Sequence, residues 1–245
     1  MSGRVAIVGA GPGDPELLTL KGRRLLEEAD IVIHDRLVAP EIVAFARTAE
    51  RIDAGKLPGA SATAQEEINA LLVRHAREGK RVVRLKGGDP MVFGRTSSEL
   101  EALVVAGISF EIVPGITSAI AAPAYAGIPV TDRRLASAVA FVTATQEDGT
   151  TNALDWVALA RMPTLVVLMG AARVDRVTRA LLDEGVDTAR PVAAIEWGTT
   201  GRQRVVRSTL GTLARDVREA GLGAPLVMVI GDVAALADRY AWFRP

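Results

Sequence analysis

Val-Val-Arg-Leu-Lys-Gly-Gly-Asp-Pro, residues 82–90, reads as an apolar strand that ends in two glycines, an acid and a proline. A loop of this kind at the carboxyl end of a strand lets a ligand touch bare backbone, because glycine has no Cβ to hold the ligand away. The carboxylate of Asp89 can then accept hydrogen bonds from a ribose or an amine. Gly-Gly-Asp also forms ordinary β-turns, so this loop alone leaves both interpretations open.

A second loop, Gly-Ala-Gly-Pro-Gly-Asp at residues 9–14, follows a strand expected at residues 5–8. Its glycine spacing is G-x-G-x-G, which differs from the G-x-G-x-x-G of dinucleotide-binding proteins. Pro12 also removes a backbone N–H that a pyrophosphate would need. The loop is therefore either a tight turn or one wall of a small-molecule site, and a nicotinamide-dependent dehydrogenase is disfavoured.

Composition narrows the classes of function. A chain of 245 residues that is 49% hydrophobic can bury the cores of two modest domains. Its 29 basic and 29 acidic residues balance, which argues against a general affinity for nucleic acid or an anionic membrane. Only 4% of residues are aromatic, which also argues against a surface that stacks the bases of single-stranded nucleic acid. Because the chain has no cysteine, disulfides, thiolate zinc sites, iron–sulfur clusters and a cysteine nucleophile are excluded.

The termini and hydropathy predict a soluble, cytoplasmic protein. The residues before the strand at 5–8 are too few for a signal peptide. No stretch approaches roughly 18 uninterrupted apolar residues, so no membrane span is expected. His34 and His75 are the two histidines of the chain, and neither lies near a nucleophile elbow.

Strands and helices alternate at short spacing over the first half of the chain, which predicts a mainly parallel sheet with helices outside it. Acidic and glycine-rich segments recur where the expected strands end, as in Asp35 after residues 31–33. The expected strands are 5–8, 31–33, 81–85 and 110–113, and the expected helices are 17–29, 40–46, 65–77 and 98–106.

Pro114-Gly115 marks the boundary between an N-terminal domain, 1–114, and a C-terminal domain, 115–245. A small apolar helix at 116–126 opens the second domain, and the strand at 203–209 resembles one arm of a hairpin. We therefore expect an α/β fold with a second, mixed sheet. Its other strands are expected at 138–143, 164–169, 192–196 and 226–231, and its helices at 173–184 and 213–220.

Motifs spread in order along the chain resemble those of the tetrapyrrole methylase family, in particular its uroporphyrinogen-III-methylating members. They are VGAGPGDPELLTLKG (8–22), IVIHDRLV (31–38), QEEIN (65–69), VVRLKGGDPMVFGR (82–95), IVPGITSAIAAPAYAGIPVT (112–131), LVVLMG (165–170) and IEWGTTGRQRVV (195–206). The resemblance implies a two-domain class III methyltransferase fold, a homodimer, no metal, and S-adenosylmethionine (SAM) bound in the interdomain cleft.

The resemblance also implies a set of cofactor-binding residues, each with a simpler structural alternative. Thr117 and Ser118 could cap the helix at 116–126, and Met169 could belong to the core. The implied SAM-binding residues are Pro12, Gly87, Gly88, Asp89, Val92, Thr117, Ser118, Met169, Gly198, Ala224 and Pro225.

Two polar residues match the family's proposed catalytic groups. Asp35 matches the proton acceptor and Lys56 the proton donor. The end of a strand is where a functional acid would lie, although Asp35 could equally cap a helix or pair with Arg36, and Lys56 could be a solvated loop residue. Arg36, Arg95 and Arg133 are the expected substrate-binding cations, with Arg134, Arg202 and Arg204 as further possible anchors.

The function implied by the resemblance is SAM-dependent C-methylation of uroporphyrinogen III at C2 and C7, which gives precorrin-2 for sirohaem and cobalamin-type biosynthesis. Uroporphyrinogen carries eight carboxylates, and several positions lack the family's usual cations, which leaves open a paralogue with a less anionic, electron-rich acceptor. A non-catalytic SAM-binding module is a third alternative. The departing positions are Leu57, Ser61, Thr96, Ser97, Asp132, Ala144 and Thr145.

Overall fold

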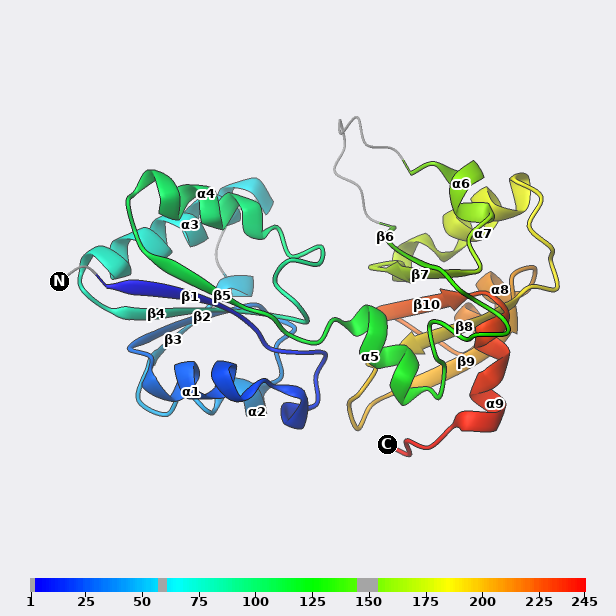
Figure 1. The fold of residues 1–245 in the computed structure, drawn as a ribbon, viewed down its shortest axis with the longest axis horizontal. Helices are drawn as coiled ribbons and strands as arrows, with labels where there is room; N and C mark the ends of the chain where they lie inside the picture. Colours follow the sequence, from blue (N-terminus) through cyan, green and yellow to red (C-terminus); the bar gives the residue numbers. More distant parts are fainter. Residues whose placement is uncertain (1–2, 57–60, 145–153) are drawn as a thin grey trace. The chain divides into compact units, whose positions relative to one another are not determined.

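A computed structural model describes residues 3–56, 61–144 and 154–245. The chain forms two compact units, Met1–Thr117 and Ser118–Pro245. Each unit is built on a five-stranded sheet (Figure 1). The expected positions Leu57 and Thr145 lie outside the described residues.

The first unit contains a fully parallel sheet in the order β3-β2-β4-β1-β5. This arrangement confirms the parallel sheet that the sequence predicts. Strand β3 was not among the predicted strands, because its sequence Glu-Arg-Ile-Asp lies at an edge and is half exposed rather than apolar. The strands are β1 (Arg4–Gly9), β2 (Ile31–His34), β3 (Glu50–Asp53), β4 (Arg81–Lys86) and β5 (Phe110–Val113).

Helices cover both faces of the first sheet (Figure 1). Helices α1 (Leu20–Glu28) and α2 (Pro40–Val43) lie on one face, while α3 (Ser61–Arg77) and α4 (Thr96–Val105) lie on the other. The predicted helix at 17–29 is wrong at its start, because Thr19 caps α1 by accepting a hydrogen bond from the Gly22 N–H at 3.0 Å. The preceding residues form the short 3₁₀ helix η1 (Pro15–Leu17), and η2 (Ala54–Lys56) follows β3.

The second unit contains a mixed sheet in the order β6-β7-β10-β8-β9. Strands β6 and β7 are parallel, and the other neighbours are antiparallel. The β8–β9 pair confirms the predicted hairpin. The strands are β6 (Val139–Thr143), β7 (Thr164–Leu168), β8 (Pro191–Glu196), β9 (Arg204–Thr209) and β10 (Leu226–Ile230).

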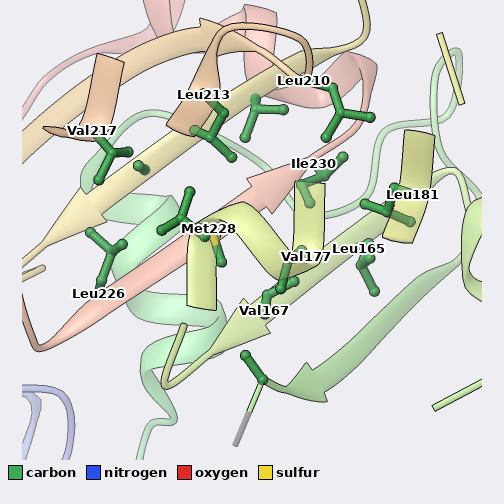
Figure 2. Packing of buried hydrophobic residues seen from close by; sticks show 14 of the residues in the cluster. Leu165, Val167, Val177, Leu181, Leu210, Leu213, Val217, Leu226, Met228 and Ile230 are labelled. Carbon is green, nitrogen blue, oxygen red and sulfur yellow. The ribbon is translucent and has the colours of Figure 1, made fainter. Parts of the chain in front are cut away.

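Helices α7 (Val174–Asp183) and α8 (Leu213–Glu219) pack on one face of the second sheet. Figure 2 shows Val177 and Leu181 of α7 beside Leu165 of β7 and Ile230 of β10. Burying a side chain of this size stabilises the fold by about 1.5–3 kcal/mol.

Shorter elements complete the second unit. Helix α5 (Ser118–Tyr125) packs against β7 and β10, and its alanines at 119, 121 and 122 are buried. Helices α6 (Trp156–Ala160) and α9 (Ala237–Tyr240) were not predicted, because four or five residues are too few to show a helical period. The remaining 3₁₀ helices are η3 (Ala171–Arg173) and η4 (Asp232–Leu236).

Among the described residues, none of the helices has both the length and the apolar character that crossing a membrane requires.

Candidate functional site

The glycine loops after β1 and β4 are joined to each other by backbone hydrogen bonds. The Gly11 N–H donates to the Gly88 carbonyl at 3.1 Å, and the Gly88 N–H donates back to Gly11 at 2.8 Å. The Ala10 N–H donates to the Lys86 carbonyl at 2.7 Å. The structure thus brings together the two loops that the sequence singled out, at the carboxyl edge of the first sheet.

The loop after β5 packs against both of them through glycine. A Cβ on Gly9 would lie 2.6 Å from the Gly115 Cα, and a Cβ on Gly115 would lie 2.3 Å from the Gly88 carbonyl oxygen. Gly88 itself has φ 67°, in the left-handed region that favours glycine. These three glycines are therefore required by the packing of the protein itself, whatever ligand the loops hold.

Asp89 orders the same loop. Its Oδ2 accepts a hydrogen bond from the Gly115 N–H at 3.0 Å, and its Oδ1 accepts one from the Met91 N–H at 2.8 Å. This carboxylate is thus partly used within the protein, and each oxygen keeps a second lone pair for a ligand donor.

Gly87 differs from its neighbours. It is exposed, and no described atom lies within 4 Å of the position that its Cβ would take. Protein packing does not require glycine at this position, so the open space in front of residue 87 is available to a ligand. Pro12 and Val92, on the flanking loops, are half-buried.

The two expected catalytic residues follow adjacent strands. His34, the last residue of β2, pairs in register with Asp53, the last residue of β3. Asp35 comes directly after β2, and Lys56 ends the 3₁₀ helix that follows β3 and lies against β2. The backbone therefore places both residues at the same carboxyl edge as the glycine loops.

Asp35 forms an ion pair with Arg84 of β4, through Oδ1 and Nη2. This pairing was not predicted, because the sequence suggested Arg36 or a helix cap as the partner. The side chain of Asp35 is 36% exposed, whereas that of Arg84 is 2% exposed. An acid that reaches solvent is thus held by a cation that does not.

Arg84 belongs to a buried charge network. Its Nε donates to the Glu99 Oε1 at 2.8 Å, and the Lys86 Nζ lies 2.9 Å and 3.0 Å from the two oxygens of Glu99. Glu99, on α4, is completely buried. We call Asp35, Arg84, Lys86 and Glu99 the charge network.

The network shifts the pKa values of its two cations in opposite directions. Burial, reinforced by the charge of Arg84, lowers the pKa of Lys86 against the attraction of Glu99. Burial also disfavours the charged form of Arg84, but Asp35 and Glu99 outweigh it and raise the pKa of that guanidinium. Arg84 therefore carries its positive charge at neutral pH.

Arg84, Lys86 and Glu99 were not among the functional residues predicted from the sequence. The signal was present, because Arg84 and Lys86, on either side of Leu85, share one face of a buried parallel strand, where charged residues are rare unless paired. Which of the chain's acids would pair with them is not visible in the sequence.

The second unit brings together another group of expected residues. Met169 follows β7, Gly198 lies just after β8, and Ala224-Pro225, joined by a cis peptide bond, precedes β10. Because β10 runs antiparallel to β7 and β8, these positions lie at one edge of the second sheet, where the Trp197 N–H donates to the Pro225 carbonyl at 3.2 Å.

Met169 is not part of the core. Its side chain is 49% exposed and its φ is 55°, an unusual backbone conformation for methionine. Gly198 has a packing reason to be glycine, since a Cβ there would lie 2.4 Å from the Cβ of Ala122 on α5. Thr117 and Ser118, at the start of α5, are half-buried.

Several expected anchors are already engaged within the protein. Arg202 stacks on the Trp197 ring at 3.5 Å, and Arg204 pairs with Glu196 at 2.7 Å and lowers the pKa of that acid. Arg134 pairs with Asp132, whose Oδ1 also accepts the Arg134 N–H at 2.8 Å. Asp132, one of the departing positions, thus has its charge balanced by a neighbour. Arg36, Arg95 and Arg133 are exposed.

Departures from the family pattern also have local roles. The hydroxyl of Thr96, which is buried, donates to the Pro90 carbonyl. Ala144 is buried after β6, and Ser97 is exposed. Ser61 is the first residue of α3.

Across residues 3–56, 61–144 and 154–245, no group of three or more histidines and acids has the arrangement of a metal site.

Comparisons with known proteins agree on one family. Residues 4–214 match the model of the Tetrapyrrole (Corrin/Porphyrin) Methylases. The uroporphyrinogen-III C-methyltransferase of Priestia megaterium is 48% identical over 94% of this chain and 98% of its own length. The siroheme synthase of Chromobacterium violaceum is 48% identical over 99% of this chain and 52% of its own length, so the chain spans about half the length of such curated relatives.

Solved structures give the same result. The uroporphyrin-III C-methyl transferase of Thermus thermophilus, complexed with S-adenosyl homocysteine, superposes with a TM-score of 0.83 at 43% identity over 96% of this chain and 100% of that one. A cobalt precorrin-4 methyltransferase superposes with a TM-score of 0.85 at 28% identity over 94% of this chain and 95% of that one. This chain belongs to the tetrapyrrole (corrin/porphyrin) methylase family.

Proposed function

We propose that this chain is a SAM-dependent C-methyltransferase that converts uroporphyrinogen III to precorrin-2 by methylation at C2 and C7. The observation that carries the proposal is the end-to-end match to a uroporphyrinogen-III C-methyltransferase. The structure adds a carboxyl edge at which glycine loops, an exposed acid and the backbone of Lys56 converge. The product would serve sirohaem or cobalamin-type biosynthesis.

Residues proposed to bind the cofactor are found in each of the two units. In the first unit, the open space before Gly87 and the half-buried Pro12, Val92 and Thr117 would receive SAM. In the second unit, the half-exposed Met169 offers a surface suited to an adenine ring. The other proposed contacts are Gly88, Asp89, Ser118, Gly198, Ala224 and Pro225.

The chemistry asked of these residues is alignment followed by proton transfer. SAM supplies a methyl group on a sulfonium, and an electron-rich ring carbon takes that methyl as the carbon–sulfur bond breaks. The glycine loops would hold the donor in line with the acceptor and exclude water. Asp35 would then accept the proton that the methylated ring releases, which restores the neutral ring after each methyl transfer, and Lys56 is proposed as the general acid when the ring's double bonds rearrange, with any proton it gives to the ring returned to solvent.

Substrate recognition is proposed for the exposed cations Arg36, Arg95 and Arg133. Each charge-assisted hydrogen bond to a carboxylate contributes roughly 1.5–3 kcal/mol. Arg134, Arg202 and Arg204 already make contacts within the protein. This observation favours a second candidate function, methylation of a less anionic, electron-rich ring.

Anaerobic incubation with SAM and enzymatically made uroporphyrinogen III, followed by mass spectrometry, tests the proposal. A gain of two methyl groups is the expected result. If the protein binds SAM in calorimetry but adds no methyl group, the acceptor is a different ring. If it binds SAM but methylates none of the electron-rich rings offered, the chain is a non-catalytic SAM-binding module rather than an enzyme.

We further infer that the protein acts as a homodimer in the cytoplasm. Light scattering on the purified protein should give twice the mass of the 25.8 kDa chain. A mass of one chain would refute the dimer.

A further inference from the structure

The charge network lies where an apolar layer would be expected. Side chains alternate along β4, so Arg84 and Lys86 share a face with Val82, and that face packs under α3 and α4. Ile33 and Leu103 belong to the same buried layer. Desolvating each charge costs several kcal/mol, so such a network is a poor device for stability alone.

The guanidinium of Arg84 is fixed on all sides. Its Nε donates to Glu99, and its Nη1 lies 3.4 Å from the Ile33 carbonyl and 3.3 Å from the Leu85 carbonyl. Its Nη2 donates to Asp35. A planar fork held at these points has little freedom to rotate, so it presents one donor in one direction.

The balance of charges in the network indicates that Arg84 is the partner of Asp35 rather than of Glu99. Lys86 contacts both oxygens of Glu99, so Glu99 already has a cation. Arg84 supplies a second positive charge, which Asp35 balances. Asp35 is also the one member of the network that reaches solvent, at 36% exposure against 3% or less for the other three.

We propose that Arg84 is a positioning residue for Asp35, and that Glu99 and Lys86 hold Arg84 in place. The proposal rests on the proposed function, in which Asp35 is the base. The contact uses Oδ1 of Asp35, which leaves Oδ2 to take the proton from the methylated ring carbon and pass it to solvent. Arg84 itself touches neither the acceptor nor SAM in this arrangement.

The first test replaces Arg84 with Lys, which keeps the charge but loses the fork. We expect kcat to fall about 10- to 100-fold, because displacing a catalytic group by an ångström has an effect of that size. The KM for the acceptor and the SAM affinity should stay unchanged. The matched control is Arg81→Lys on the same strand, where Arg81 pairs with Asp30 before β2, and kcat should not change.

A double-mutant comparison separates positioning from a merely structural role. In an Asp35→Asn background, Arg84→Lys should cause no further loss of kcat, since there is no base left to position. An equal loss in both backgrounds would overturn the proposal. If Asp35→Asn alone leaves kcat normal, the assignment of the base fails instead, which is a separate result.

A crystallographic test does not depend on turnover. Crystal structures of the unmodified protein and of Arg84→Lys should differ in the position of the Asp35 carboxylate, which should shift or occupy two conformers in the variant. An Asp35 side chain in the same single position in both structures would refute the positioning role, even if no acceptor is ever methylated.

Discussion

At the amino edge of the first sheet, Asp30 pairs with Arg81, and at the carboxyl edge of the same two strands, Asp35 pairs with Arg84. Residue types, strands and ion-pair chemistry are the same at both ends. The arginine side chain is 52% exposed at the amino edge and 2% exposed at the carboxyl edge. Only the second pair is backed by a buried lysine and glutamate.

The exposed pair links the starts of two neighbouring strands, whereas the buried pair is the one that we propose orients Asp35. Asp30 accepts the backbone N–H of Arg81 at 2.8 Å and its guanidinium at 2.9 Å, which ties down the start of β4 in water. A surface pair of this kind contributes little to stability. The buried pair is costly to form, and its cost is understandable if the orientation of Asp35 matters to the reaction.

The largest expected effect, on kcat, comes from replacing Asp35 and Asp30 one at a time. Asp35→Asn should lower kcat about 10²- to 10⁴-fold, the usual contribution of general base catalysis, and leave SAM binding intact. Asp30→Asn removes an equivalent carboxylate from the other edge and should leave kcat unchanged. Steady-state kinetics and calorimetry on both variants check this, and equal effects would erase the distinction between the edges.

Glu99→Gln tests how much the buried network depends on its central acid. Removing one partner leaves Arg84 and Lys86 buried beside Asp35 alone, and such a change costs about 3–5 kcal/mol of unfolding free energy. Urea denaturation measures it, with Asp30→Asn as the surface control that should change the midpoint far less. A midpoint as high as that of the unmodified protein would mean that the charges are better solvated than their burial indicates.

Gly87→Val sharpens the assignment of the ligand to the carboxyl edge. The new side chain meets open space in the protein, so the unfolding temperature should change little, whereas SAM affinity should fall about tenfold or more. Titration calorimetry and thermal unfolding are read together. Unchanged affinity in a stably folded variant would place SAM elsewhere.

The smallest effect is a pH dependence at the amino edge. Hydrogen bonds from Arg81 lower the pKa of Asp30 from 3.8 to about 2. A carboxyl whose pKa is lower in the folded state adds stability above 3.8, and this stability is lost as the pH falls towards 2. The difference in urea midpoint between the unmodified protein and Arg81→Met should therefore be largest above pH 4 and shrink towards pH 2. A difference that is constant with pH would contradict this origin.

The sequence predicted most of the fold because most strands of both sheets are apolar runs followed closely by glycine, proline or an acid. It missed β3, which lies half-exposed at an edge, and α6 and α9, which are too short to show a period. For the site, the loop at 87–89 and the position of Asp35 could be predicted from where strands end.

The partners within the site could not be predicted in the same way. Asp35 and Arg84 are 49 residues apart in the sequence, and Glu99 lies on a different element again. Asp132 was noted as an acid at a position where the family usually has another residue, and the structure pairs it with Arg134, two residues away. The end of a strand determines the position of a residue in the fold, whereas the identity of its ion-pair partner depends on how separate elements pack.

The contact among Gly9, Gly88 and Gly115 bears on how the family could diversify. The backbone of the loop after β4 is fixed by glycines, while Met91 and Phe93 on that loop are 57% and 42% exposed. The glycines that fix the backbone and the exposed side chains on the loop can therefore mutate independently. A lineage can exchange Met91 to accept a new ring without disturbing the scaffold, which makes this position a natural place for directed evolution to begin, whereas the φ of 53° at Phe93 restricts the residues tolerated there.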